Sequence, residues 1–74
     1  MNHAFEPNFV IIAHSLAAAN VISISSEIPA EIIPGADNRF AVIGRFPILY
    51  ARKYDHVEFS ERWQQQANWK DLPL

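Results

Sequence analysis

The strongest constraint on the fold is a run of twenty residues, 7–26, that contains no Lys, Arg, Asp or Glu. A run of this length can cross a bilayer as a helix. However, Asn8, His14, Asn20 and four serines interrupt it. In addition, no Lys or Arg precedes it to orient a membrane span or to begin a signal peptide. The run therefore favours elements buried inside a protein, and we expect no membrane association.

The size and composition of the chain indicate one small domain. Its 74 residues are 50% hydrophobic, which excludes a disordered chain because disorder requires low hydrophobicity and high net charge. We expect a single domain over 1–74, with 1–7 and 71–74 frayed at the ends. The chain has no cysteine, so disulfides and cysteine-bound zinc are excluded. Since secreted domains of this size usually carry disulfides, we expect a cytoplasmic location.

Hydrophobic spacing predicts an N-terminal helix over 8–19. Phe9, Ile12 and Leu16 recur at steps of three and four residues, which is the spacing of one helix face. The β-branched run 10–12 favours extended backbone, so a strand is the competing interpretation for this segment.

Alternating apolar side chains and turn residues predict a sheet downstream of this helix. The predicted strands cover 21–25, 40–46 and 48–54. Pro29 and Pro34 confine any strand between the first two to a sheet edge, because proline lacks the N–H that an inner strand needs. The sequence PGADN, residues 34–38, predicts a turn. Gly44 indicates a bulge or a close backbone approach.

The C-terminal part predicts a short helix. Asp55 and Ser60 are candidate N-caps, and Phe59, Trp63 and Ala67 are spaced four residues apart. The chain as a whole is therefore expected to have a small α+β fold. It combines an N-terminal helix, a three-stranded antiparallel sheet covered on one face and a short C-terminal helix.

Charge is separated along the chain, whose formal net charge is −2. Residues 1–38 contain four acidic and no basic side chains, whereas residues 39–54 contain four basic and no acidic side chains. Strand parity directs the phenylalanines of the basic segment towards the core and its first two arginines outward. Because Arg and Tyr are favoured at protein interfaces, we expect an outward docking patch here.

The candidate partner-binding residues are Arg39, Arg45, Tyr50, Arg52, Lys53, Tyr54 and Trp69. Trp69 is included because it lies six residues from Trp63, so the two rings cannot share one helix face. Packing of the C-terminal tail on its own domain is the alternative role for Trp69. For the basic segment 39–54, solvated charges on two ordinary strands and a nucleic-acid surface are the alternatives.

No catalytic or metal-binding constellation is predicted. His3, His14 and His56 lack the spacing of a helical metal-binding pair. The chain has two glycines and neither a phosphate-binding loop nor a nucleophile elbow. We therefore expect a protein that is not an enzyme and that uses no cofactor.

These exclusions leave a non-enzymatic protein-interaction module that regulates or inhibits a larger protein machine by binding its surface. Small, cysteine-free, mildly acidic domains are typical of phage or mobile-element proteins that act on host enzymes. By this analogy, the expected partner is host RNA polymerase or a nucleic-acid-targeting defence complex. One alternative is a small nucleic-acid-binding transcriptional regulator that uses 39–54. Another is a structural subunit of an oligomer, so monomer and homodimer both remain open.

Overall fold

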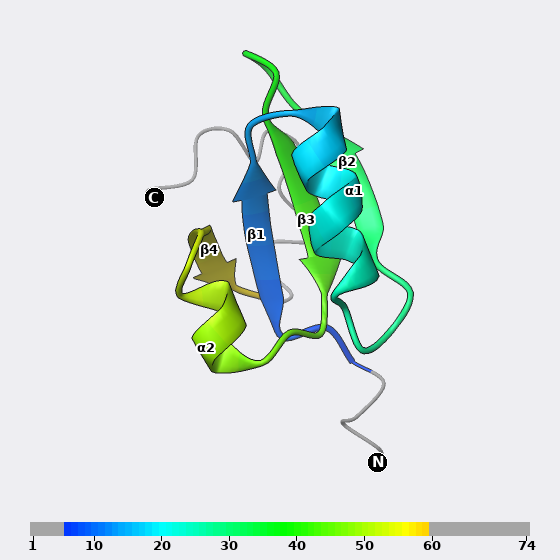
Figure 1. Ribbon diagram of the computed structural model, residues 1–74, viewed down its shortest axis with the longest axis vertical. Helices are drawn as coiled ribbons and strands as arrows, with labels where there is room; N and C mark the ends of the chain where they lie inside the picture. The colour runs from blue at the N-terminus through cyan, green and yellow to red at the C-terminus, as the bar shows by residue number, and fades with distance from the viewer. Residues whose placement is uncertain (1–5, 60–74) are drawn as a thin grey trace.

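The computed structural model describes residues 6–59, which form an antiparallel sheet and two helices (Figure 1). In chain order the elements are β1 (Phe9–Ala13), α1 (Leu16–Ile24), β2 (Glu31–Pro34), β3 (Phe40–Gly44), α2 (Ile48–Ala51) and β4 (Asp55–Glu58). The sheet order is β2-β3-β1-β4, and every neighbouring pair is antiparallel. This βαββαβ order is the split βαβ connectivity of ferredoxin-like domains. Such connectivity supports many unrelated functions, so function must be argued from the surface.

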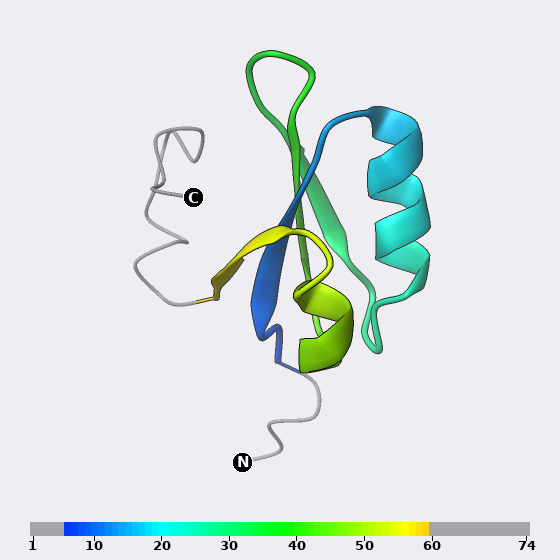
Figure 2. The same ribbon diagram turned by 60° about the vertical axis from the view of Figure 1, so that its left-hand side comes forward.

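Both helices lie on the same face of the sheet, as the two views in Figures 1 and 2 show. The prediction of a small α+β fold with an antiparallel sheet is therefore confirmed, although the sheet has four strands and not three. Within residues 6–59, neither helix has the length and apolar character needed to cross a membrane.

The first half of the predicted N-terminal helix, 8–19, is a strand. Phe9–Ala13 form β1, and α1 begins only at Leu16. β1 lies between β3 and β4 at the centre of the sheet, and its side chains pack into the buried clusters on both faces, so its apolar run does not alternate. The Oγ atom of Ser15 accepts a hydrogen bond from the backbone N–H of Ala18 at 3.0 Å. This N-cap determines where the helix starts.

The predicted strand over 21–25 is wrong, because this segment forms the last turns of α1. The inward face of the helix consists of Ala19 and Ile22, which lie three residues apart. Ile24, which the alternating pattern placed on the same side as Ile22, points outward instead and is 82% exposed. The helix ends where the N–H of Ser25 donates to the carbonyl of Ile22 at 3.0 Å.

The predicted strand over 48–54 is also wrong. Ile48–Ala51 form α2, a short helix that starts after Pro47, and β4 begins at Asp55. Pro47 has a φ of −58°, which suits the start of a helix, and its carbonyl accepts the first hydrogen bonds of the turn. Asp55 therefore begins a strand and does not cap the predicted C-terminal helix, whose other residues, 60–67, lie outside the described part of the chain.

The edge strand and the turn that follows it agree with the predictions. β2 lies at one edge of the sheet and ends at Pro34. In the hairpin between β2 and β3, Asp37 and Asn38 have φ angles of 60° and 58°. The N–H of Arg39 donates to the carbonyl of Ala36 at 3.1 Å. Two left-handed central residues closed by this bond are the features of a type I′ turn.

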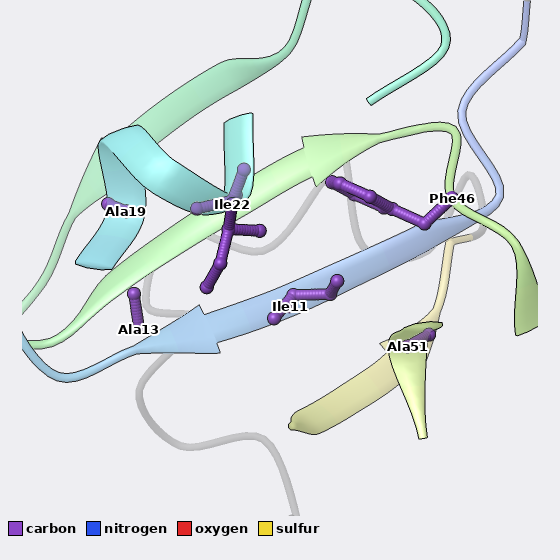
Figure 3. Close-up of a cluster of buried hydrophobic side chains, with 7 residues drawn as sticks. Ile11, Ala13, Ala19, Ile22, Phe46 and Ala51 are labelled. Atoms are coloured by element: carbon purple, nitrogen blue, oxygen red, sulfur yellow. The ribbon is translucent and has the colours of Figure 1, made fainter. Parts of the chain in front are cut away.

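Buried side chains lie on both faces of the sheet. Beneath the helices, the fully buried members of the core are Ile11, Ala13, Ala19, Ile22, Val42, Phe46 and Ala51 (Figure 3). On the opposite face, the buried members are Val10, Ile12, Ala41 and Ile43. The predicted parity of β3 is thus confirmed, with Phe40 and Val42 under the helices and Ala41 and Ile43 opposite. The expectation that only one face is covered is wrong, because both faces of the central strands are buried.

Gly44 lies at a close backbone approach, as predicted. A Cβ atom at this position would lie 2.5 Å from the Oγ of Ser26 and 3.0 Å from its Cβ. The same Oγ accepts hydrogen bonds from the backbone N–H groups of Arg45 at 3.0 Å and Ile28 at 3.3 Å. Ser26 therefore fixes the segment after α1 against the end of β3.

Candidate binding surface on the helical layer

The first two arginines of the basic segment 39–54 lie at opposite ends of β3. The five residues of the strand separate them, which corresponds to about 20 Å at the rise of a β-strand. Both side chains are partly buried, and the Nη1 of Arg45 donates to the backbone carbonyl of Glu6 at 3.2 Å. Arg39 and Arg45 therefore do not lie together in one patch. Trp69, which was also predicted to bind a partner, lies outside the described residues.

The remaining predicted residues come together on α2 and the turn that follows it. Three rings form an aromatic row: Phe46 and Tyr50 are stacked with centroids 5.8 Å apart, and Tyr50 and Tyr54 are 5.3 Å apart. They lie four residues apart in the sequence, so helical and turn backbone aligns them, not the strand that was predicted. The Nζ of Lys53 lies 5.9 Å from the centre of the Tyr50 ring, within reach of a cation–π contact. Arg52 is exposed beside Lys53.

The two tyrosines of the aromatic row are linked electrostatically. A side-chain hydrogen bond with Tyr50 is the main cause that raises the pKa of Tyr54 above its ordinary value of 10.0. Burial and the electrostatic effect of Tyr50 act in the same direction. Tyr54 is therefore a neutral phenol throughout the physiological range, and the charge at this surface comes from Arg52 and Lys53.

Sequence reasoning missed the main feature of this surface, which is its exposed aliphatic area. Among residues 6–59, the strongly exposed large aliphatic side chains are Leu16 (55%), Val21 (61%), Ile24 (82%), Ile48 (54%) and Leu49 (71%). All five belong to α1 or α2. We call this set the helical surface. The two helices form one layer on one side of the sheet (Figure 2). These five side chains are the exposed part of that layer, whereas its buried side chains belong to the core.

The outward side of α1 is unusual for a helix at a protein surface. None of its nine residues is charged, whereas a surface helix normally presents charged and polar residues to water. Its exposed positions form two adjacent rows with a spacing of four, one of Leu16, Asn20 and Ile24 and one of Ala17 and Val21. The sequence already shows that this helix has no charged residue, because the uncharged run 7–26 includes the whole helix. A helix that is apolar on both sides is typical of one that is covered by another surface.

Outside the helical surface, the structure pairs one histidine with one carboxylate. The Nε2 of His14 lies 3.3 Å from the Oδ2 of Asp55, and both side chains are about two-thirds exposed, at 66% and 64%. A polar contact this exposed contributes little to stability. Within residues 6–59, no group of three or more His, Asp or Glu side chains gathers at one point that could hold a metal ion.

The face of the sheet opposite the helices has no base-stacking platform on its central strands. Four-stranded sheets that bind single-stranded RNA place aromatic rings at these positions. Here the corresponding side chains of β1 and β3 are Val10, Ile12, Ala41 and Ile43, and all four are buried. The nucleic-acid alternative therefore has no support from this face.

The chain matches no known protein family, no curated protein and no solved structure. Its function must therefore be argued from the helical surface and the charges beside it.

Proposed function

We propose that this chain is a non-enzymatic protein-binding module whose partner docks on the helical surface. The observation that carries the proposal is the position of the exposed aliphatic side chains. Every one of them that is found in residues 6–59 lies on the helical layer, above a core that is already closed by other side chains. Exposed aliphatic area that is concentrated on one side of a small domain marks an interaction site.

Burial of this surface can offset the free-energy cost of association with a partner, but it exceeds that cost by only a small margin. Complete burial of one Val, Leu or Ile side chain contributes about 1.5–3 kcal/mol. The five side chains of the helical surface are each more than half exposed, so together they offer roughly 5–9 kcal/mol. Association itself costs about 4 kcal/mol or more in lost freedom of motion. Polar contacts at the edge of the surface must therefore add to the affinity.

A capture experiment with paired variants tests the proposal. The full chain is immobilised as wild type, as the double variant Ile24→Ser/Leu49→Ser and as Glu31→Ser, a control at an exposed position of β2. We expect the wild type and the control to retain the same protein from cells of the source organism. The double variant should retain about tenfold less of it, because the two most exposed aliphatic side chains of the helical surface are lost.

Circular dichroism establishes that all three proteins are folded. Equal retention by the double variant contradicts the proposal. Sedimentation velocity then addresses a second copy of the chain as the partner. A wild-type dimer that the double variant converts to a monomer would assign the helical surface to self-assembly, which is the structural-subunit alternative.

The finer form of the proposal is that the module regulates or inhibits a larger protein machine, with host RNA polymerase or a defence complex as the candidate. Its support is the analogy with small, cysteine-free phage and mobile-element proteins. Purified RNA polymerase, assayed for transcription with wild type and with the double variant, tests this form. Inhibition by the wild type alone is the expected result, and equal transcription with both proteins contradicts it for this enzyme.

A further inference from the structure

The part of the helical surface on α2 lies next to charged side chains, whereas α1 has no charged residue. Ile48 and Leu49 are exposed, and the exposed cations Arg52 and Lys53 follow each of them by four residues. The N–H of Arg52 donates to the carbonyl of Ile48 at 3.1 Å, so this turn keeps helical geometry. Side chains one helical turn apart lie next to each other. Ile48 therefore has the Arg52 cation beside it, and Lys53, whose N–H donates to the carbonyl of Tyr50 at 3.1 Å, follows at the end of the same turn. We call these four residues the α2 edge.

The α2 edge is held in place from below. Phe46, which stacks on Tyr50, is 1% exposed and belongs to the core beneath the helices (Figure 3). The side chain of Asn8 fixes the backbone of Phe46 from both sides. Its Oδ1 accepts from the Phe46 N–H at 2.8 Å, and its Nδ2 donates to the Phe46 carbonyl at 2.9 Å. Ala51, in the same turn, is fully buried. A surface that is ordered before binding loses less conformational entropy when a partner arrives.

The two cations of the α2 edge are available to an external anion. Residues 38–54 contain no Asp or Glu. Within residues 6–59, neither Arg52 nor Lys53 forms an ion pair, and the side chain of Lys53 contacts the Tyr50 ring. The next carboxylate in the chain, that of Asp55, lies against His14. The positive charge here is therefore not neutralised by the described part of the chain.

We infer that the α2 edge binds an acidic segment of the partner protein in which aliphatic or aromatic side chains flank the carboxylates. The inference rests on the proposed function and names the partner's chemistry at one end of the same surface. Carboxylates of the segment pair with Arg52 and Lys53, and the Arg52 guanidinium can hold one of them through two parallel hydrogen bonds. The apolar side chains of the segment cover Ile48 and Leu49.

Nucleic acids and membranes fit this site less well than a protein segment. A protein binds a nucleic-acid backbone mainly because many Lys and Arg side chains neutralise phosphates and release their counterions. The α2 edge has only two such side chains. A nucleic-acid backbone would also leave Ile48 and Leu49 in water. An interfacial membrane helix needs a long apolar face, whereas α2 has four residues.

Selection from a library of random short peptides, displayed on phage and panned on the immobilised full chain, tests the inference without assuming a partner. We expect the selected peptides to be enriched in Asp or Glu next to Leu, Ile, Phe or Trp. Charge reversal in R52E/K53E should weaken their binding by about tenfold or more, because attraction becomes repulsion at both cations. Selection of peptides without acidic enrichment, or of none, overturns the inference. Equal binding to R52E/K53E also overturns it.

A matched pair of variants separates this inference from the proposed function. Ile48→Ser removes an exposed aliphatic side chain from the α2 edge, and Leu16→Ser removes one of almost equal exposure, 54% against 55%, from α1. We expect the selected acidic peptides to lose affinity for Ile48→Ser and to bind Leu16→Ser as they bind the wild type. If the peptides instead lose affinity for Leu16→Ser and bind Ile48→Ser as they bind the wild type, the inference is overturned, but the helical surface remains the binding site. Retention of the partner by Ile24→Ser/Leu49→Ser, in the earlier capture experiment, contradicts the proposed function itself.

Two further probes address the other polyanions. Vesicles that contain phosphatidylserine and a single-stranded oligonucleotide are each incubated with the wild type and with R52E/K53E. We expect neither probe to be retained at physiological salt. Retention of either one by the wild type, and its loss in R52E/K53E, overturns the inference in favour of a lipid surface or a nucleic acid.

Discussion

At the scale of single residues, Gly44 is a position where the fold has no space for a side chain. A Cβ atom would lie 2.5 Å from the Oγ of Ser26, and Ser26 cannot easily move because its Oγ holds two backbone N–H groups. We therefore expect Gly44→Ala to lower the free energy of unfolding by about 1–3 kcal/mol, as overpacked sites do. Urea denaturation followed by circular dichroism measures this difference.

The chain offers a matched control in its other glycine. Gly35 lies in the exposed hairpin and does not have a positive φ, so Gly35→Ala should change the free energy of unfolding by no more than about 0.5 kcal/mol. If both alanine variants are as stable as the wild type, Ser26 is not fixed against Gly44 as the structure indicates.

At the scale of elements, the N-cap of α1 determines where an otherwise ambiguous apolar run becomes helical. Ser15→Ala removes the side-chain acceptor of the Ala18 N–H and should lower the free energy of unfolding by about 1 kcal/mol. Thermal denaturation measures the loss. The exposed Ser25, at the other end of the same helix, closes it with its backbone N–H, so Ser25→Ala should have a much smaller effect. Equal losses in the two variants would contradict a specific role for the cap.

The elements that sequence reasoning predicted correctly are those with local signals. The turn follows from the Pro, Gly, Asp and Asn residues of 34–38, the edge position of β2 follows from Pro34, and the parity of β3 follows from the alternating direction of side chains along a strand. The errors fall where burial or apolar character on both sides makes the local spacing misleading. β1 is buried on both faces and so does not alternate, and α1 is apolar on both sides and so shows no single helical face.

Part of the candidate site was predicted from the sequence, because that part also has a local signal. Tyrosines and cations near residues 50–54 were expected on one surface, and the structure brings them together, although on helical and turn backbone. Their spacing of four residues contained this information. The exposure of Ile24 or Leu49 could not be predicted in the same way. Whether an apolar side chain faces the core depends on which elements pack beside it, and that is decided by the tertiary arrangement.

At the scale of the whole molecule, one layer of helices in the described part of the chain separates the side chains that close the core from those that remain exposed. The inward sides of α1 and α2 close the core over the sheet (Figures 2 and 3), and their outward sides present the helical surface. A domain of this size has only a few kcal/mol of net stability. It can therefore lose little core packing and remain folded, whereas its outward aliphatic side chains can change without a loss of stability.

Two isoleucines of α1 provide the direct test of this separation. Ile22 is 1% exposed and Ile24 is 82% exposed, in the same helix and two residues apart. Ile22→Ala should lower the free energy of unfolding by about 2–5 kcal/mol, since it opens a cavity beneath α1, and this loss is enough to unfold a large fraction of the protein. Ile24→Ala should change it by no more than about 0.5 kcal/mol and yet weaken partner binding. Chemical denaturation and the capture assay measure the two effects. A large stability loss in Ile24→Ala would mean that this side chain serves the fold and not the partner.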